Sequence, residues 1–256
     1  MKTRFTLTVT AALLALSAGA SAQGVDEFGP YGDLENRYRA PITQRFAFEV
    51  RVGPYTPRVD EQVSGAPYET TFGDSQRWFG GVEADWQLLR LEKVLSLGPG
   101  LAWAYTNSSG KGMLTSGEGR SAQESTLNIM PLLLGAVLRV DALADNTPVP
   151  LVPYAKAGLA GAIWWSRDGG EIAQDEASGT DGSDFSYGYF GAAGLMLRLD
   201  FLDQDDANTA RAATGIDHSY LFAEYSMSRL DGFGSDGSMD VGTDTFVFGV
   251  AAEVLF

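Results

Sequence analysis

The chain has 256 residues, no cysteine and a formal charge of −15 at pH 7. Without cysteine, disulfides, thiol catalysis and an N-terminal lipid anchor on cysteine are excluded. The strong negative charge argues against binding of nucleic acid or another polyanion through bulk electrostatics.

The first 22 residues predict a secretory signal peptide. Lys2 and Arg4 form a basic n-region, an apolar stretch follows, and Ala20 and Ala22 make an A-x-A cleavage motif. The apolar stretch is too short and wrongly flanked for a membrane-spanning helix. We expect cleavage after Ala22, which would change the formal charge to about −17.

Residues 23–43 are polar and contain proline and glycine, so we expect a periplasmic lead-in rather than a domain. Residues 44–256 alternate between strand-like segments and loops rich in Gly, Ser and Asp, which predicts one β-domain. The longest apolar run after the signal peptide, 129–138, is interrupted by Pro131. The sequence therefore predicts no transmembrane helix.

Eight segments alternate apolar residues with small or polar ones at the period of a membrane-spanning β-strand. They cover residues 44–54, 76–88, 94–106, 124–140, 151–165, 185–201, 219–229 and 246–256. The fourth segment is apolar on both parities, so its register stays open, and its proline suggests a bulge. A ten-stranded alternative would place an extra pair within 55–75, where two prolines and a glycine interrupt the pattern.

An even number of strands places both ends of the barrel on one side, which we expect to be the periplasmic side. Connections after odd strands should then be long and extracellular, and those after even strands short. The connection at 202–218 is longer than this rule predicts and could contain a short helix over 203–213.

The last strand-like segment ends on an aromatic residue. One of its faces is apolar throughout and includes Phe248, Val250, Ala252, Val254 and Phe256. This pattern is typical of the closing strand of an outer-membrane barrel, which the barrel-insertion machinery reads. We therefore expect an assembly signal here, with outer-membrane lipid, the barrel-assembly machinery and periplasmic chaperones as partners; no native ligand is indicated.

Aromatic residues on the outward parity predict girdles at the two membrane interfaces. They are Trp78, Trp86, Trp103, Tyr105, Trp165, Tyr187 and Tyr189. Trp78 and Trp86 are eight residues apart on one face. At ~3.3 Å per residue and a tilt of ~40°, this spans roughly 20 Å, close to the apolar band of such barrels.

The inward parity carries charged residues of both signs, which are Arg45, Glu49, Arg51, Glu83, Asp85, Lys156, Arg198, Glu224 and Glu253. One interpretation is a selective pore, and the other is an ion-pair network that fills the barrel. The network is favoured because an eight-stranded barrel is only wide enough for its own side chains. Nearly balanced signs also suit internal pairing, since buried charges persist when paired.

Catalysis finds little support in the sequence. His218 is the one histidine, and Asp217 and Ser219 beside it should point to the opposite face of a strand. Nucleophile-elbow, P-loop, zinc and EF-hand spacings do not occur. We therefore expect no enzyme activity, no cofactor and no metal site.

A soluble β-sandwich or lipocalin-like barrel is the main architectural alternative, but it should place its apolar face inward. Segments 51–60 (RVGPYTPRVD), 138–141 (LRVD) and 149–158 (VPLVPYAKAG) resemble the outer-membrane barrel family first defined in myxobacteria. More distantly, the chain is similar to OmpA/OmpX-type and OmpW-type barrels. The resemblance implies a single outer-membrane barrel, no assigned activity and no functional residues to carry over.

The sequence thus predicts an all-β protein, an eight-stranded antiparallel transmembrane barrel in the outer membrane. The expected role is structural or in surface interaction. The alternatives are a narrow porin-like channel or a lateral-diffusion transporter for a small apolar solute, and, least favoured, a lipid-modifying enzyme.

Overall fold

The computed structural model describes residues 44–112, 119–121, 123–174, 181–200, 215–235 and 238–255. The expected signal peptide with its cleavage motif, the lead-in, Phe256 and the helix expected over 203–213 lie outside these residues.

The described residues form ten strands and three short helices. In chain order they are β1 (Arg45–Tyr55), α2 (Val59–Gln62), α3 (Pro67–Phe72), β2 (Arg77–Trp86), β3 (Leu89–Leu91), β4 (Leu95–Gly110), β5 (Ser125–Arg139), α4 (Ala142–Asn146), β6 (Leu151–Asp168), β7 (Glu171–Ile172), β8 (Ser183–Arg198), β9 (Ile216–Arg229) and β10 (Asp244–Leu255). None of these helices has the length and apolarity needed to cross a membrane.

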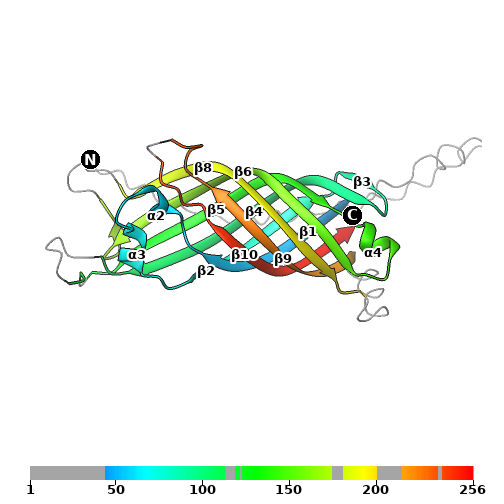
Figure 1. The fold of residues 1–256 in the computed structure, drawn as a ribbon, viewed down its shortest axis with the longest axis horizontal. Helices are drawn as coiled ribbons and strands as arrows, with labels where there is room; N and C mark the ends of the chain where they lie inside the picture. Colours follow the sequence, from blue (N-terminus) through cyan, green and yellow to red (C-terminus); the bar gives the residue numbers. More distant parts are fainter. Residues whose placement is uncertain are drawn as a thin grey trace, which may run out of the picture. The chain divides into compact units, whose positions relative to one another are not determined.

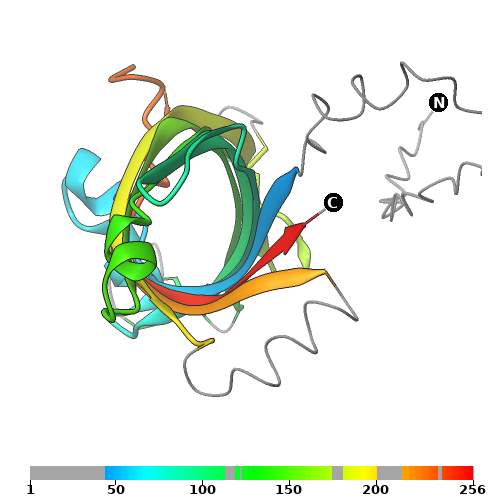
Figure 2. The ribbon, with the colours of Figure 1, turned by 90° about the vertical axis from the view of Figure 1, so that its right-hand side faces the viewer.

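Eight long antiparallel strands close into a barrel, as predicted. Around the barrel the order is β1, β10, β9, β8, β6, β5, β4 and β2, and β2 pairs with both β4 and β1 to close the ring. Figure 1 shows the strands tilted against the barrel axis, and Figure 2 shows the closed ring from one end. Closure leaves no unpaired edge among these eight strands, which is the condition for a β-structure in lipid.

The two additional strands are short extensions of this ring. β3 pairs with the start of β4, and β7 pairs with the end of β6. The ten-stranded barrel was wrong: eight strands close the ring, and the segment between β1 and β2, where the extra pair was expected, forms α2 and α3. Pro67 stands in the first turn of α3, where its missing N–H costs no helical hydrogen bond.

The connections divide between two ends of the barrel. α2 and α3 lie at one end, called here the α2–α3 end, and β3 and α4 lie at the other, the α4 end (Figure 1). Arg45 at the start of β1 pairs with Leu255 at the end of β10. The barrel's first and last strands therefore begin and end together at the α4 end (Figure 1).

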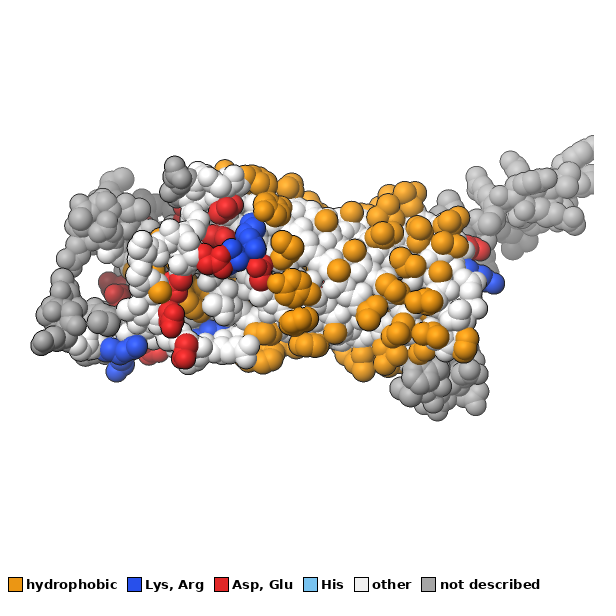
Figure 3. Space-filling model, in the orientation of Figure 1, with side chains coloured by type: hydrophobic (Ala, Val, Ile, Leu, Met, Phe, Trp, Pro, Cys, Tyr) orange, Lys and Arg blue, Asp and Glu red, His pale blue; other side chains and the backbone are white. Residues whose placement is uncertain are grey.

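Along the strands, side chains alternate between the outside and the inside of the barrel. In β1, Phe48, Val50 and Val52 are exposed outside, whereas Glu49 and Arg51 are buried inside. Figure 3 shows the outcome on one face, where apolar side chains gather over the strands and charged ones near the α2–α3 end. This inside-out distribution is the reverse of a soluble barrel, so the soluble alternative is wrong.

β5, whose register the sequence left open, places Leu132, Leu134 and Leu138 outside and Arg139 inside. The suggested bulge at Pro131 was wrong, because the pairing with β4 keeps one register on both sides of it. The ladder between β4 and β5 is instead interrupted at this proline, which has no N–H to donate.

A bulge does occur in β9. Glu253 of β10 pairs with His218, and the next residue pairs with Ile216, so Asp217 is the extra residue. The bulge re-aims this part of the strand. The expectation that Asp217 and His218 point to opposite faces was therefore wrong.

Candidate functional site

Seven charged side chains meet in the middle of the barrel and form what we call the ionic layer. Each is at most 5% exposed. They come from β1, β2, β5, β6 and β9 and are Glu49, Arg51, Glu83, Asp85, Arg139, Lys156 and Glu224. Strand alternation alone directs them inward, because each occupies the parity opposite to the apolar exterior.

Lys156 connects the two sides of the ionic layer. Its Nζ lies 2.8 Å from Glu49 Oε2, 2.7 Å from Glu83 Oε1 and 3.6 Å from Glu224 Oε2. Glu49 belongs to β1 and Lys156 to β6, and these strands stand opposite each other in the ring of eight. This ion pair therefore spans the lumen.

Two arginines complete the ionic layer. The Arg51 guanidinium donates to both Glu83 and Glu224, and the Tyr154 hydroxyl donates to Glu224 over 2.9 Å. Arg139 lies 2.5 Å from Asp85 Oδ2 and 3.4 Å from Glu49 Oε1.

The ionic layer contains four carboxylates and three cations, so one carboxylate is in excess. Ligand oxygens of Glu49, Glu83 and Asp85 lie within 4.8 Å of one another, a spacing that could hold a metal ion. The same three residues are already bound by Lys156 and by the two arginines. The protein's own cations thus supply most of the countercharge that a metal would bring.

A smaller charged group lies at the α4 end. Arg45 binds Asp217 over 2.5 Å and Glu253 over 2.8 Å. Arg90 lies 3.6 Å from Glu253, and the Tyr220 hydroxyl donates to the same carboxylate over 3.2 Å.

The nine inward charges expected from the sequence thus divide into three places. Six belong to the ionic layer, and Arg45 and Glu253 belong to the α4-end group. Arg198 lies at the edge of the α4-end group, because its guanidinium lies 2.8 Å from Asp145 of α4 and its side chain also bonds Tyr220. Sequence reasoning missed Arg139 because both parities of β5 are apolar, and it missed Asp217 because the bulge in β9 was not foreseen.

Between the ionic layer and the α2–α3 end, the lumen contains apolar side chains together with buried Ser and Thr hydroxyls. Phe79, Ala102, Leu133 and Val247 line one small cavity there, with Arg51 as another of its lining residues. The cavity has a volume of about 50 Å³, enough for a few water molecules. It also touches Pro131, where the β4–β5 ladder is interrupted.

The α2–α3 end is covered by two connections, residues 56–76 and the described residues 230–235 and 238–243, which together we call the lid. The lid buries Val59, Tyr68, Leu230 and Val241 against the barrel. The Tyr55 hydroxyl at the end of β1 donates to the Val241 carbonyl, which ties the strand to the lid. Tyr68 shares a 2.7 Å hydrogen bond with Ser108 Oγ, and burial raises the pKa of its hydroxyl.

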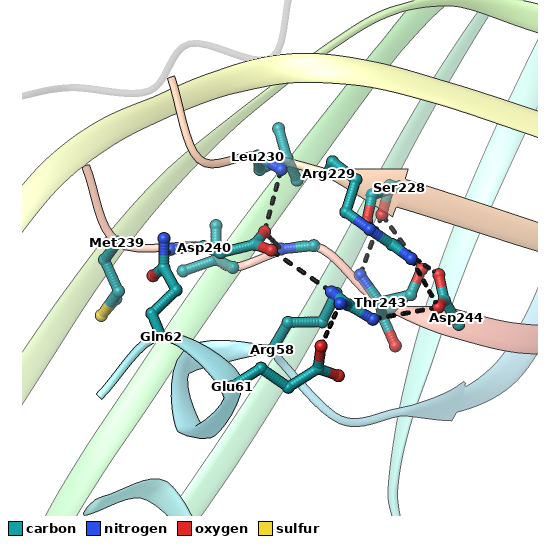
Figure 4. A network of polar contacts seen from close by, with 12 residues as sticks. Arg58, Glu61, Gln62, Ser228, Arg229, Leu230, Met239, Asp240, Thr243 and Asp244 are labelled. Atoms are coloured by element: carbon teal, nitrogen blue, oxygen red, sulfur yellow. Dashed lines mark hydrogen bonds and ion pairs between the residues drawn. The ribbon is translucent and has the colours of Figure 1, made fainter. Parts of the chain in front are cut away.

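Arg58 holds the two connections of the lid together (Figure 4). Its guanidinium binds Glu61 on its own connection, Asp240 over 3.3 Å and Asp244 over 3.1 Å. Its backbone N–H donates to the Gly242 carbonyl over 3.0 Å. Asp240 also accepts the Leu230 and Gly242 N–H groups, both over 2.9 Å.

His218 lies at the α4 end. Its Nδ1 pairs with Asp200, and its Nε2 lies 3.7 Å from Asp217 Oδ2. Among the described residues, no Ser or Thr hydroxyl is hydrogen-bonded to its ring. Within the described chain, carboxylates alone are hydrogen-bonded or ion-paired to this ring, so it has the acid partner of a hydrolytic triad without a bonded hydroxyl.

Most of the aromatic residues expected in girdles are exposed on the outside of the barrel. These are Trp78, Trp103, Tyr105, Tyr187 and Tyr189. Trp86, at the other end of β2, stacks on Phe46 with ring centroids 6.0 Å apart, and Trp165 is half-buried. Phe248 and Val250 of the expected assembly signal are also exposed outside; their role in assembly stays a prediction.

A closed antiparallel barrel, apolar outside and ionic inside, defines the class of integral outer-membrane β-barrels. The chain has the fold of this class, whose members reside in the outer membrane. No protein-family model matches the chain, and neither does any curated protein.

The solved structures that resemble the chain include three that each match 82% of its length. Ail, the attachment invasion locus protein of Yersinia pestis, crystallised with the heparin analogue sucrose octasulfate, has 12% identity, 98% of its own chain covered and a TM-score of 0.41. The outer membrane protein OprG of Pseudomonas aeruginosa has 11% identity, 95% coverage and a TM-score of 0.47. The N-terminal β-barrel domain of OprF from the same bacterium has 12% identity, 97% of its own chain covered and a TM-score of 0.31. The fold assignment itself rests on the strand pairing and side-chain distribution of this chain.

Proposed function

We propose that this protein is a sealed, non-enzymatic outer-membrane barrel whose role is structural or lies in contacts made by its α2–α3 end. The ionic layer serves as a charge-paired plug, and the α2–α3 end faces outward from the cell. Within this class, its motifs favour the barrel family first defined in myxobacteria.

The observation that carries the proposal is the ion pair between Glu49 and Lys156 across the lumen. Side chains from opposite strands that meet at 2.8 Å occupy the centre of the lumen at that level, which supports a sealed interior. Lys156 also binds Glu83, so the contact is anchored to a third strand. A selective pore would instead need unpaired charges around open space.

Conductance in planar lipid bilayers tests the sealed interior. The refolded barrel should give no stable single-channel steps. The double variant Glu49→Ala/Lys156→Ala removes the contact across the lumen and should raise the frequency of current steps. Leu159→Ala, on the lipid face of β6, is the matched control and should stay silent. Stable steps from the unchanged protein would exclude a sealed interior.

A second candidate function, lateral passage of a small apolar solute, is supported by the cavity that reaches Pro131. The cavity is lined mainly by apolar and aromatic residues, with Arg51 and four Ser or Thr residues, and lies beside the one interruption in the described β4–β5 ladder. Its volume of about 50 Å³ is far below that of a typical ligand pocket, so passage would need the seam or the lid to open.

Thermal unfolding of the barrel in detergent, with and without indole, tests this second function. Binding to the folded state alone should raise the unfolding temperature saturably. Leu133→Trp, which fills the cavity, should abolish the increase. Pro131→Ala restores an N–H to the seam and should reduce it. An unchanged unfolding temperature at saturating indole would exclude the cavity as a binding site.

A further inference from the structure

One connection of the lid crosses the rim of the barrel from the inside to the outside. Leu230 is 1% exposed, and its N–H donates to Asp240 within the lid. Three residues later, Phe233 is 58% exposed. Its ring lies against Tyr187 and Tyr189 on the outer face of β8, with centroids 5.8 Å and 6.3 Å apart.

The backbone is held in this position by an unusual conformation. Gly232, Phe233 and Gly234 all have positive φ angles, of 68°, 59° and 85°. Glycine adopts this region freely, but a bulky aromatic residue adopts it only at a cost in conformational energy. The Gly232 N–H donates to the Tyr187 carbonyl over 2.8 Å, which fixes the turn to β8.

The strained turn directs an aromatic side chain away from the protein interior, and within the described chain most of its ring remains uncovered. Strain of this kind persists where the surroundings compensate for it. The surface that Phe233 joins consists of Tyr187, Tyr189 and Phe185, which are all about half exposed on the outside of the barrel. Phe185 and Tyr187 stack with centroids 6.5 Å apart. This surface continues the lipid-facing exterior of the barrel.

We propose that Phe233, with Tyr187 and Tyr189, is a lipid anchor that attaches the lid to the membrane interface at the α2–α3 end. The partner is the boundary between acyl chains and headgroups, where aromatic rings with an apolar body reside. The proposal goes beyond the sealed-barrel function, because it assigns a lipid contact to a connection rather than to a strand.

The absence of cysteine in the sequence allows a direct depth measurement. Phe233→Cys is labelled with a nitroxide, and the barrel is refolded into phosphatidylcholine vesicles. Val250→Cys, exposed in the middle of β10, serves as the lipid reference. Thr70→Cys, exposed on α3, serves as the water reference. Accessibility to oxygen and to a water-soluble nickel chelate is then compared at the three positions.

The label at position 233 should be at least fivefold less accessible to the chelate than the label at position 70. Its oxygen accessibility should lie within twofold of that at position 250. Chelate accessibility equal to that of position 70 would overturn the proposal. Shielding that appears only when the protein-to-lipid ratio is raised would show contact with a second barrel, and would also overturn it.

A second measurement keeps the native aromatic ring. In bicelles, nuclear Overhauser effects from lipid acyl protons to the Phe233 ring should match those to the Tyr187 ring in strength. Phe233→Leu, which remains apolar, should keep lipid contacts at its methyl groups. Contacts to water alone at the Phe233 ring, beside lipid contacts at Tyr187, would overturn the proposal.

Discussion

Arg139 lies 2.5 Å from Asp85 and 3.4 Å from Glu49, so one guanidinium serves two buried carboxylates. Lys156 and Arg51 are shared in the same way, and one negative charge remains in excess. Losing one cation therefore leaves several carboxylates of the ionic layer short of a partner, whereas neutralising one carboxylate only reduces the charge excess. Removing a cation should damage the barrel far more than neutralising an acid.

The first prediction follows from this asymmetry. Arg139→Met leaves two buried carboxylates without their shared partner and should destabilise the barrel by about 3–5 kcal/mol. Asp85→Asn keeps an oxygen that accepts from Arg139 and removes the excess charge, so it should cost less than about 1 kcal/mol. Urea unfolding of refolded barrels, followed by tryptophan fluorescence, measures both. Equal losses for the two variants would contradict the proposed charge excess.

The second prediction concerns the lipid face of β6, where Ala157 is exposed beside the buried Lys156. Ala157→Arg places a charge in hydrocarbon and should cost about 2–4 kcal/mol. Ala157→Met, which also adds a long flexible side chain but no charge, is the matched control and should be nearly neutral. The free energy of unfolding in lipid vesicles separates the two variants. A neutral arginine would mean that this position lies outside the hydrocarbon.

The barrel and most of its inward charges could be predicted from the sequence, because a period of two fixes which side chains share a face. Alternation in β1 is sufficient to place Glu49 and Arg51 inside, without knowledge of their partners. The alternation did not assign a face where both parities of a strand are apolar. Both parities of β5 are apolar, so Arg139 had no assigned face until the pairing with β4 and β6 fixed the register.

Tertiary features that leave no periodic pattern in the sequence could not be predicted from it either. The bulge at Asp217 appears only as a one-residue slip between β9 and β10. The lid depends on Arg58 meeting Asp240 and Asp244, which are more than 180 positions later in the chain. Loop residues carry no pattern that indicates such a partner, so the contact follows only from closure of the barrel.

The third prediction tests the lid. Arg58→Gln removes the cation shared by Asp240 and Asp244, so the two connections should separate more often. Hydrogen exchange at the Leu230 and Gly242 amides should accelerate about tenfold or more, which corresponds to a loss of at least about 1.4 kcal/mol of local stability. Mass spectrometry of peptides from this connection records the change.

The control for the lid experiment is Glu61→Gln, which changes the most exposed partner of Arg58. It should alter exchange little, because exposed ion pairs contribute about 0–1 kcal/mol. Amides in the middle of β6 should exchange equally slowly in all variants. Faster exchange throughout the barrel after Arg58→Gln would show that this residue supports the whole fold rather than the lid.

The fourth prediction concerns the close approach of β5 and β6. A Cβ added at Gly158 would lie 2.2 Å from the Leu134 carbonyl oxygen and 2.4 Å from the Gly135 Cα, both backbone atoms. Backbone in a closed ladder cannot move aside as a side chain can, so Gly158→Ala should cost about 1–3 kcal/mol.

Gly80→Ala is the matched control, since nothing lies within 4 Å of its added Cβ on the exposed face of β2. That variant should be neutral, or should stabilise the barrel by about 0.4–1 kcal/mol because alanine lowers the conformational entropy of the unfolded chain. Unfolding midpoints of the two refolded barrels decide the matter, and a neutral Gly158→Ala would show that β5 and β6 are not held this closely.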